Sequence, residues 1–562
     1  MGLLDHLSAQ RAQYTPYLGL LYIALALLAL LILLNPIRLI RKARKPPRHR
    51  SVAIVVLGDV GRSPRMMYHA ESFAGMGWET FLVGYRGSKL IPSLLEAPHV
   101  REIYLREPPA FISKLPRLAF LLWAPYKILF QVYTVLQTLL GELPYPPEFI
   151  LVQNPPSIPT LALVQLCCWL HGSKLIVDWH NLGYTILGLR LGKSNPVVWV
   201  AKMCVDVLLV SHRDSGKQEG DWAARRFEMT FGRKAYAHLF VTHAMQEVLV
   251  KDWKLEGIKA VLHDRPPAHF HPSETTEIHD LFTRLDLTSA GVDFFPPYRA
   301  PLSTPLTQLK DSSDLSPSAA VSPLFGNTLP RLRPDRPALV VSSTSWTPDE
   351  DFALLLNAMA FYEKRARAAN DPPSTRGISA ASKAAGAGKG GKGEKLPKIL
   401  VIVTGKGPLR DKFMEDIEEC QKLWRWVRCV PMWLEAADYP VLLGSADVGV
   451  SLHTSSSALD LPMKIVDMFG CGLPVCALGF DCLDELVKEG ENGLIFRNAL
   501  ELAAQLEALL KGFPQARELK KLREGLEHQS SAKAKDGERW NTWGEEWDRV
   551  VKPIVIHRPG VQ

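Results

Sequence analysis

The chain has 562 residues, of which 47% are hydrophobic and 22% charged, and it carries a formal net charge of +8. This length exceeds what one hydrophobic core supports and favours two large domains. Much of the positive charge lies in one run, residues 38–50, and no basic stripe interleaved with aromatic residues indicates a nucleic-acid partner. The eight cysteines lack zinc-binding spacing, which indicates free thiols in a reducing compartment.

Residues 15–34 form an uncharged, mostly apolar run near the N-terminus. As a helix this run is about 30 Å long, which matches one bilayer core. A densely basic flank follows, and positive residues stay cytosolic, so we expect residues 1–45 to be a single-pass anchor with the rest of the chain in the cytosol. A cleaved signal peptide is the alternative, but no small-residue cleavage site follows and the charges lie on the wrong side of the run.

Two sets of continuous apolar runs predict strands of parallel sheets that are covered on both faces. The first set comprises residues 52–57, 80–83, 149–153, 174–180, 238–245 and 259–264, and the second comprises residues 338–345, 398–407, 427–431, 447–453, 473–477 and 493–496. Because the alternation of strand and helix occurs twice, the fold class is α/β with two Rossmann-like, doubly wound domains that face a cleft.

The predicted domains are separated by a segment of weak periodicity. We expect a first domain over residues 50–270 and a second over 336–515, joined by a Pro- and Ser-rich linker or insertion over 271–335. Within the second domain, residues 371–395 are of low complexity and end in lysines, so we expect a disordered insertion there.

Two further segments have unusual apolar faces. Residues 110–143 are apolar but interrupted by charges and a proline, so they form either an amphipathic surface that lies on the bilayer and receives a lipid substrate or a buried hairpin of helices. Residues 516–562 contain Trp540, Trp543 and Trp547 at helical spacing, so we expect a terminal helical segment that packs back across both domains.

A glycine-rich loop follows the first strand, at the carboxyl end where α/β sheets bind ligands. Its glycines allow close backbone approach, the next helix presents free N–H groups, and arginines add positive charge. We therefore expect an anion site formed by Gly58, Gly61, Arg62, Ser63 and Arg65. A plain tight turn is the alternative, and the dinucleotide-binding fingerprint is excluded because its third glycine is missing.

A second loop, in the C-terminal half, combines hydroxyls with a helix N-terminus. His453, Ser455 and Ser456 precede a helix that carries Lys464 in its first turn, and these groups can cradle a diphosphate. Asp467 lies three residues after Lys464 and shares its face of the helix. A carboxylate at that position can bind both hydroxyls of a ribose.

Five motifs together resemble one family, the chitobiosyldiphosphodolichol beta-mannosyltransferases, which are GT-B glycosyltransferases of N-glycan assembly. The motifs are GDVGRSPR, DWHN, VSSTSWTPDEDF, GKGPL and LDLPMKIVDMFGCGLPVCA, and the resemblance covers about residues 50–510 plus the anchor. It implies GDP-mannose as donor, dolichol-diphosphate-linked chitobiose as acceptor, inversion at the anomeric carbon and no cofactor. It also implies the endoplasmic reticulum membrane as location, other lipid-linked-oligosaccharide mannosyltransferases as partners, and the acceptor diphosphate as the anion bound by the glycine-rich loop.

The sequence departs from the wider GT-B pattern at the donor diphosphate. Retaining relatives place an Arg and a Lys after the first strand of the second domain, where this chain has hydroxyls. The diphosphate would then depend on Ser343, Thr344 and Ser345, with Lys406 and Lys464 as cations. This departure argues against a retaining mechanism.

No metal is expected at the site. The one Asp-x-Asp motif, residues 349–351, fits the acidic first turn of a helix better than a metal site.

A displacement at the anomeric carbon needs a base for the acceptor hydroxyl. His180, with Asp178, ends a strand of the first domain, and histidine titrates in the range that suits a general base. Asp59 in the glycine-rich loop is the rival, and His243 and His263 end neighbouring strands.

Two other kinds of protein fit the pattern less well. One is another lipid-linked GT-B enzyme, either a retaining mannosyltransferase or an N-acetylglucosaminyltransferase. The other is a non-catalytic membrane scaffold, against which the Lys464 and Asp467 face and the GKGP turn argue.

Overall fold

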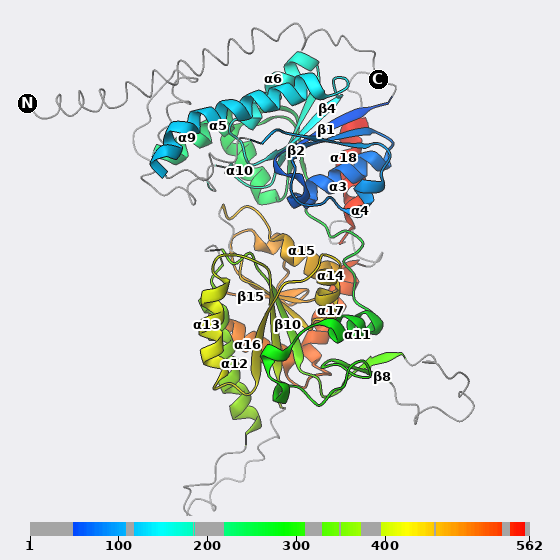
Figure 1. Ribbon diagram of the computed structural model, residues 1–562, viewed down its shortest axis with the longest axis vertical. Coiled ribbons are helices and arrows are strands. Elements are labelled where there is room, and N and C mark those ends of the chain that lie inside the picture. The colour runs from blue at the N-terminus through cyan, green and yellow to red at the C-terminus, as the bar shows by residue number, and fades with distance from the viewer. Residues whose placement is uncertain are drawn as a thin grey trace, which may run out of the picture. The chain divides into compact units, whose positions relative to one another are not determined.

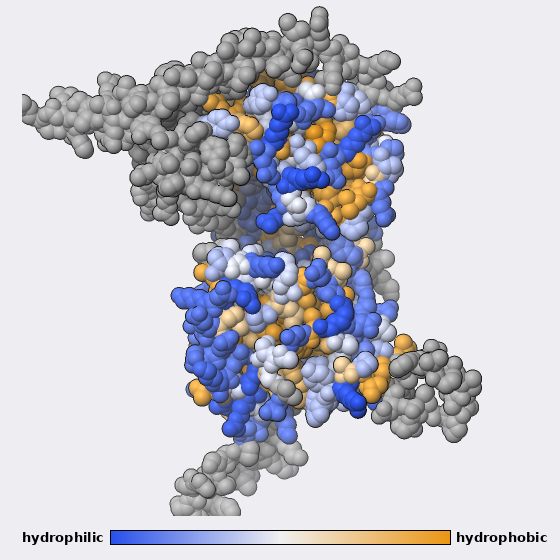
Figure 2. Space-filling view, viewed as in Figure 1, coloured by the Kyte–Doolittle hydropathy of each residue, from blue (hydrophilic) through white to orange (hydrophobic). Residues whose placement is uncertain are grey.

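The computed structural model describes residues 49–107, 117–183, 185, 219–309, 329–347, 350–371, 395–453, 457–530 and 540–556. The predicted anchor at 15–34 and nearly all of the predicted insertion at 371–395 lie outside them. Among the described helices, none is both long and apolar enough to cross a membrane. The chain divides into a first unit, residues 1–263 with 544–562, and a second unit, residues 264–543 (Figure 1 and Figure 2).

The first unit is built on a seven-stranded parallel sheet of order β3-β2-β1-β4-β5-β6-β7. Its strands are β1 (Ser51–Asp59), β2 (Glu79–Tyr85), β3 (Val100–Tyr104), β4 (Phe149–Asn154), β5 (Lys174–Trp179), β6 (Lys234–Phe240) and β7 (Glu256–Val261). The central strands are buried along almost their whole length, as expected for apolar runs covered on both faces. Edge strand β3 was not predicted because its residues are partly or fully exposed and form no apolar run.

Helices connect these strands and cover the sheet. They are α3 (Pro64–Gly75), α4 (Pro92–Glu96), α5 (Arg117–Gln137), a π-helix η3 (Thr138–Glu142), α6 (Thr160–His171), α9 (Glu219–Gly232), α10 (His243–Trp253) and α18 (Trp543–Ile556). Helix α5 and η3 bear on the two alternatives for residues 110–143. Val135 and Leu139 are fully buried, whereas Tyr126 and Ile128 are exposed, so the second half of the segment belongs to the core.

The second unit contains a six-stranded parallel sheet of order β12-β11-β10-β13-β14-β15. Its strands are β10 (Ala338–Ser343), β11 (Ile399–Thr404), β12 (Val427–Met432), β13 (Val448–Ser451), β14 (Val475–Leu478) and β15 (Gly493–Phe496). Its helices are α11 (Thr275–Arg284), α12 (Phe352–Asn370), α13 (Arg410–Gln421), α14 (Asp438–Ser445), α15 (Met463–Gly470), α16 (Ala499–Leu510) and α17 (Arg517–Ser530). Two hydrophobic clusters cover the two faces of this sheet, so the prediction of two doubly wound domains is confirmed.

The described part of the predicted linker or insertion at 271–335 belongs to the second unit and is not a connection between the units. It contains α11 and a two-stranded sheet of β8 (Thr307–Leu309) and β9 (Pro330–Leu332). Ile278, Leu281 and Phe282 of α11 pack in the same cluster as the strands of the second sheet. Their spacing of three and four residues is the helical pattern that the surrounding prolines and serines concealed.

The described part of the C-terminal segment 516–562 is largely helical and is divided between the two units. Helix α17 lies in the second unit, where Trp540 packs edge-on against Phe469 with ring centroids 5.6 Å apart. Helix α18 belongs to the first unit except for its first residue, Trp543. There Trp547 packs edge-on against Phe73 at 5.0 Å, and its Nε1 donates to His69 Nδ1 at 3.0 Å.

We predict that Trp547→Ala destabilises the protein strongly, because Trp547 is almost fully buried. Truncating a buried Trp costs roughly 3–5 kcal/mol. The measurement is thermal unfolding of the purified chain, with Trp169→Ala as the matched control because Trp169 is 79% exposed. Equal melting temperatures for the two variants would contradict the packing of α18.

Candidate functional site

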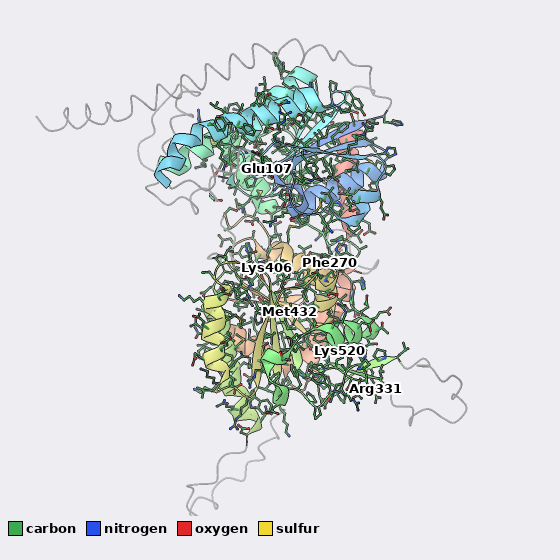
Figure 3. The ribbon with its side chains drawn as sticks, viewed as in Figure 1. Glu107, Phe270, Arg331, Lys406, Met432 and Lys520 are labelled. Carbon is green, nitrogen blue, oxygen red and sulfur yellow. The ribbon has the colours of Figure 1, made fainter. Side chains whose placement is uncertain are left out.

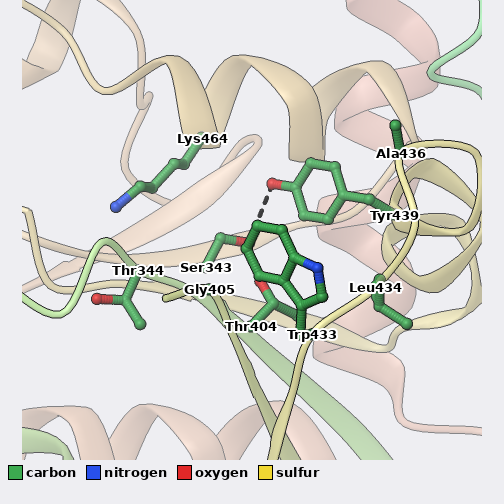
Figure 4. Close-up of a pocket in the computed structure, with 9 residues that line it drawn as sticks. All are labelled: Ser343, Thr344, Thr404, Gly405, Trp433, Leu434, Ala436, Tyr439 and Lys464. Carbon is green, nitrogen blue, oxygen red and sulfur yellow. Dashed lines mark hydrogen bonds between the residues drawn. The ribbon is translucent and has the colours of Figure 1, made fainter. Parts of the chain in front are cut away.

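A pocket of about 380 Å³ opens at the carboxyl edge of the second sheet (Figure 4). Strands β10, β11 and β12 end here side by side, because parallel strands all end at one edge. The loops that follow them supply most of the lining, and α14 and α15 supply the rest. The lining residues are Ser343, Thr344, Thr404, Gly405, Trp433, Leu434, Ala436, Tyr439 and Lys464.

The structure brings three of the predicted donor-binding residues, Ser343, Thr344 and Lys464, into this one pocket. Lys406 lies beside it, with its Nζ 3.9 Å from the ring centre of Trp433. Figure 3 places Lys406 at the end of the second unit where the strands end, away from Arg331.

The other predicted donor-binding residues are placed differently. Ser345 is exposed just after Thr344, and His453 forms a backbone bridge with Glu350. Asp467 lies on α15, one turn after Lys464 and outside the pocket lining. Ser455 and Ser456 lie outside the described residues. The donor-binding role of the whole set stays a prediction.

Tyr439 and Trp433 are two lining residues that sequence analysis did not identify. The Tyr439 hydroxyl donates to Ser343 Oγ at 3.0 Å (Figure 4). Burial, followed by the charge of Asp467, raises the pKa of Tyr439, so its hydroxyl keeps its proton and remains a donor. Trp433 is 60% exposed at the pocket wall. Its position directly after strand β12 is the signal that could have identified it.

Glu350 joins the elements around the pocket. This buried carboxylate accepts from Lys464 Nζ at 2.8 Å through Oε1. Its Oε2 accepts from the Ser345 backbone N–H at 3.0 Å and also from the Thr344 hydroxyl. Both oxygens therefore face donors, and the carboxylate fixes the loop after β10 to the first turn of α15.

The described residues of the acidic motif at 349–351 have different contacts. Asp351 caps α12, since its Oδ1 accepts from the Leu354 backbone N–H at 3.2 Å, as expected for an acidic helix start. Glu350 instead points into the site and pairs with Lys464. Asp349 lies outside the described residues.

Asp467 has an unusual protonation equilibrium. Burial, together with the charge of Asp264, raises its pKa to about 8. Near neutral pH the carboxyl is therefore largely protonated in the free protein. A carboxylic acid of this kind both donates and accepts hydrogen bonds, which suits contact with neighbouring hydroxyls.

The first unit has a buried charge cluster at its own carboxyl edge. Asp178, at the end of β5, is fully buried and accepts from Arg65 through both oxygens, at 2.8 and 2.9 Å. His69 Nε2 and His180 Nε2 lie 3.1 and 2.9 Å from its Oδ2. Burial alone would raise the pKa of Asp178, but the charges of Arg65 and His180 hold it well below its usual range.

Two of the sequence predictions for this region are corrected. Arg65 was expected to bind an anion, but it is only 2% exposed and its guanidinium is held by Asp178 and by the Leu262 carbonyl. The reason is that Arg65 starts α3 on the face that packs on the sheet. Asp178 has no exposed surface, so it cannot touch substrate and acts as a positioning residue for His180, which is partly exposed.

Asp59 closes the glycine-rich loop. Its carboxylate accepts from Gly61 N at 3.0 Å, from Ser88 N at 2.9 Å and from Ser88 Oγ at 2.8 Å. Burial would raise its pKa, but these hydrogen bonds, with the charge of Arg62, lower it, which makes Asp59 a weak base near neutral pH.

The rest of the glycine-rich loop fits the predicted anion site in part. A side chain at Gly61 would come within 2.4 Å of the Ser88 carbonyl oxygen, so this glycine is required for the close approach of the two loops. Gly58 meets no such obstacle. Arg62 pairs with Asp59 at 3.4 Å but its side chain is largely exposed, and Ser63 directly precedes α3, so both lie where an anion could reach them. Whether the loop binds one stays a prediction.

The sequence is similar to known glycosyltransferases along most of its length. A family model for glycosyl transferases group 1 matches residues 392–512. The chitobiosyldiphosphodolichol beta-mannosyltransferase of Mus musculus is 38% identical over 92% of this chain and 91% of its own length, and that of Homo sapiens is 39% identical over 90% and 93%. The chain belongs to this family. A relative named UDP-glycosyltransferase TURAN, from Arabidopsis thaliana, is 40% identical over 89% of this chain and 96% of its own.

Solved structures agree on the fold. The Anabaena Alr3699/HepE complex with UDP and glucose has a TM-score of 0.51 at 12% identity, over 91% of this chain and all of that one. A glycosyltransferase from Rickettsia africae has a TM-score of 0.50 at 11% identity, over 91% and 100%. The chain is therefore a hexosyltransferase with the two Rossmann-like sheets of the GT-B fold.

We predict that Glu350→Gln raises the KM for the sugar donor by roughly ten- to a hundredfold, the effect of losing one charge-assisted hydrogen bond. Because both oxygens of Glu350 accept hydrogen bonds, the NH₂ group of the glutamine would face either Lys464 Nζ or the Ser345 N–H, and both of these are donors. Asp351→Asn is the matched control, since Asn also caps a helix. A purely structural role would lower the melting temperature without a selective change in donor KM, and this outcome would contradict the prediction.

A second prediction concerns pH. The carboxyl of Asp467 ionises near 3.8 when unfolded and near 8 when folded, so between these pH values folding requires the carboxyl to take up a proton. Stability of the wild type relative to Asp467→Asn should therefore fall as pH rises from about 4 to about 8 and then level off. Urea unfolding of both proteins across this range measures the difference, and parallel pH profiles would show that the pKa is not raised.

Proposed function

We propose that this enzyme transfers mannose from GDP-mannose to dolichol-diphosphate-linked chitobiose and forms a β-1,4 linkage with inversion, without a metal. The observation that carries the proposal is the pocket at the carboxyl edge of the second sheet, where Lys464 and the hydroxyls of Ser343 and Thr344 line one cavity. The curated relatives with this activity in their names support the choice of acceptor.

The donor fits the pocket by its chemistry. Hydroxyls and the Lys464 ammonium suit a diphosphate, and the exposed indole of Trp433 offers a flat surface for a purine base. Asp467 would bind the ribose. When the bond from the anomeric carbon to the diphosphate breaks, the GDP that leaves carries negative charge, which Lys464 stabilises.

His180 is the base in this proposal. Because Asp178 is ionised, His180 Nε2 carries the proton that it shares with Asp178, and Nδ1 keeps the lone pair. The acceptor hydroxyl gives its proton to Nδ1 as its oxygen attacks the anomeric carbon, and the bond to GDP breaks on the opposite face. Arg65 keeps Asp178 charged and therefore keeps this tautomer.

The enzyme works, in this proposal, at the cytosolic face of the endoplasmic reticulum membrane, held by the uncharged segment 15–34 as a single span. The basic run that follows this segment supports the orientation. Other mannosyltransferases that act on the same lipid-linked oligosaccharide are the partners we expect there.

The test is a transfer assay with the full chain, radiolabelled GDP-mannose and a short-chain lipid-linked chitobiose, followed by digestion of the product with a β-mannosidase. We expect labelled product that the β-mannosidase releases, and competition by GDP but not UDP. Transfer from a UDP-sugar instead, as the name of the TURAN relative suggests for that protein, would refute the donor.

We also predict that His180→Ala lowers kcat by roughly 10²–10⁴, the usual contribution of a general base. His528→Ala, an exposed histidine on α17, is the matched control and should leave kcat unchanged. Wild-type turnover in a folded His180→Ala protein would remove His180 as the base without affecting the proposed substrates.

A further inference from the structure

Large apolar side chains are exposed at the end of α6. Leu166, Trp169 and Leu170 stand three and four residues apart, so they share one face of the helix, and all three are well exposed. Trp169 is the most exposed of them, at 79%. Ile556, the last residue of α18, is also exposed. We call these four residues the amino-edge patch.

Hydrogen bonds place this patch at the amino edge of the first sheet. Helix α6 ends at a left-handed Gly172, and the chain then enters β5. Lys174 N donates to the Glu148 carbonyl at 2.9 Å, and Glu148 N donates to the Ser51 carbonyl at 3.0 Å. The starts of β5, β4 and β1 therefore lie in one row, and α6 ends beside them. Figure 1 shows α6 along the end of the first unit that carries β1 and β4.

The N-terminal segment joins the folded unit at the same edge. Arg50, which directly precedes β1, pairs with Glu148 at 2.6 Å and donates to the Val555 carbonyl at 2.7 Å. The end of α18, and with it Ile556, thus also lies here. Residues 35–48, which connect the predicted span to this point, reach at most about 50 Å even when fully extended.

We propose that the amino-edge patch is a membrane-contact surface that rests on the bilayer interface. The inference depends on the anchor in the proposed function, since a span at 15–34 attaches the chain to the membrane and the chain enters the first unit at this edge, next to Arg50. An exposed Trp flanked by two Leu is the kind of side-chain group that partitions into the interface. The neighbouring basic run, residues 38–50, suits anionic headgroups.

Contact between the amino-edge patch and the bilayer would fix the orientation of the first unit, which a single membrane anchor does not do. Attachment at one point leaves the first unit free to rotate about it, whereas a second contact fixes its orientation to the bilayer. The lipid-linked acceptor is held in the same bilayer, so a fixed orientation raises the effective concentration of its sugars at the site.

The test uses the full chain in lipid nanodiscs of phosphatidylcholine and phosphatidylinositol, with a photo-crosslinking amino acid at position 169 or 170. After irradiation, mass spectrometry should find lipid adducts at both positions. Position 423 is the control, because Leu423 is also a highly exposed leucine, at 76%, but lies in the second unit. Adducts to protein only, or equal lipid adducts at 423, would overturn the inference.

A kinetic experiment separates this inference from the proposed function. Trp169→Ser with Leu170→Ser should raise the KM for a dolichol-length acceptor in bilayers by roughly tenfold. The KM for a water-soluble, short-chain acceptor should not change. An equal KM change for both acceptors would overturn the inference, while absence of transfer by the wild type with either acceptor would refute the proposed function instead.

Discussion

A carboxylate that is removed from water must have charged or hydrogen-bonding partners, and this requirement organises the chemistry-bearing edges of both sheets. In the first unit Asp178 is surrounded by Arg65, His69 and His180. In the second unit Glu350 is surrounded by Lys464 and by donors from the loop after β10. Each carboxylate holds one polar side chain at the rim of its site in a single orientation. Removing Asp178 would leave the buried guanidinium of Arg65 without its carboxylate, and removing Glu350 would take the acceptor from the Thr344 hydroxyl and the Ser345 N–H.

The carboxylates of Asp178 and Glu350 have different effects on the cations beside them. Arg65 keeps Asp178 ionised, so the first unit holds His180 against a buried carboxylate, and Arg65 does not reach the surface to bind an anion. In the second unit Glu350 stands just after the hydroxyl-rich strand end and draws Lys464 toward it from α15. A cation thereby reaches the pocket from a helix, although the loop after β10 has none. In the proposed function, Lys464 thereby takes the place of the cationic pair of retaining enzymes at the donor diphosphate.

Sequence reasoning succeeded where one physical rule dominates. Continuous apolar runs predict buried parallel strands, and nearly all strands of both sheets were found this way, whereas β3 was missed because an exposed edge strand lacks the signal. Buried charges were the main source of error. Arg65 looked like a surface ligand because only its partner, 113 positions away, reveals that it is buried. Tyr439 enters the pocket from α14 through tertiary packing and has no local pattern that marks it, whereas Trp433 could have been identified from its position directly after β12.

The strands themselves set the distance between membrane and chemistry in the proposed arrangement. The amino-edge patch and His180 lie at opposite ends of the first sheet, and β4 and β5 have six residues each. At about 3.3 Å per residue the two edges are about 20 Å apart. A sugar attached directly to a lipid would remain at the bilayer surface, so an acceptor whose diphosphate and two sugars extend outward suits this spacing.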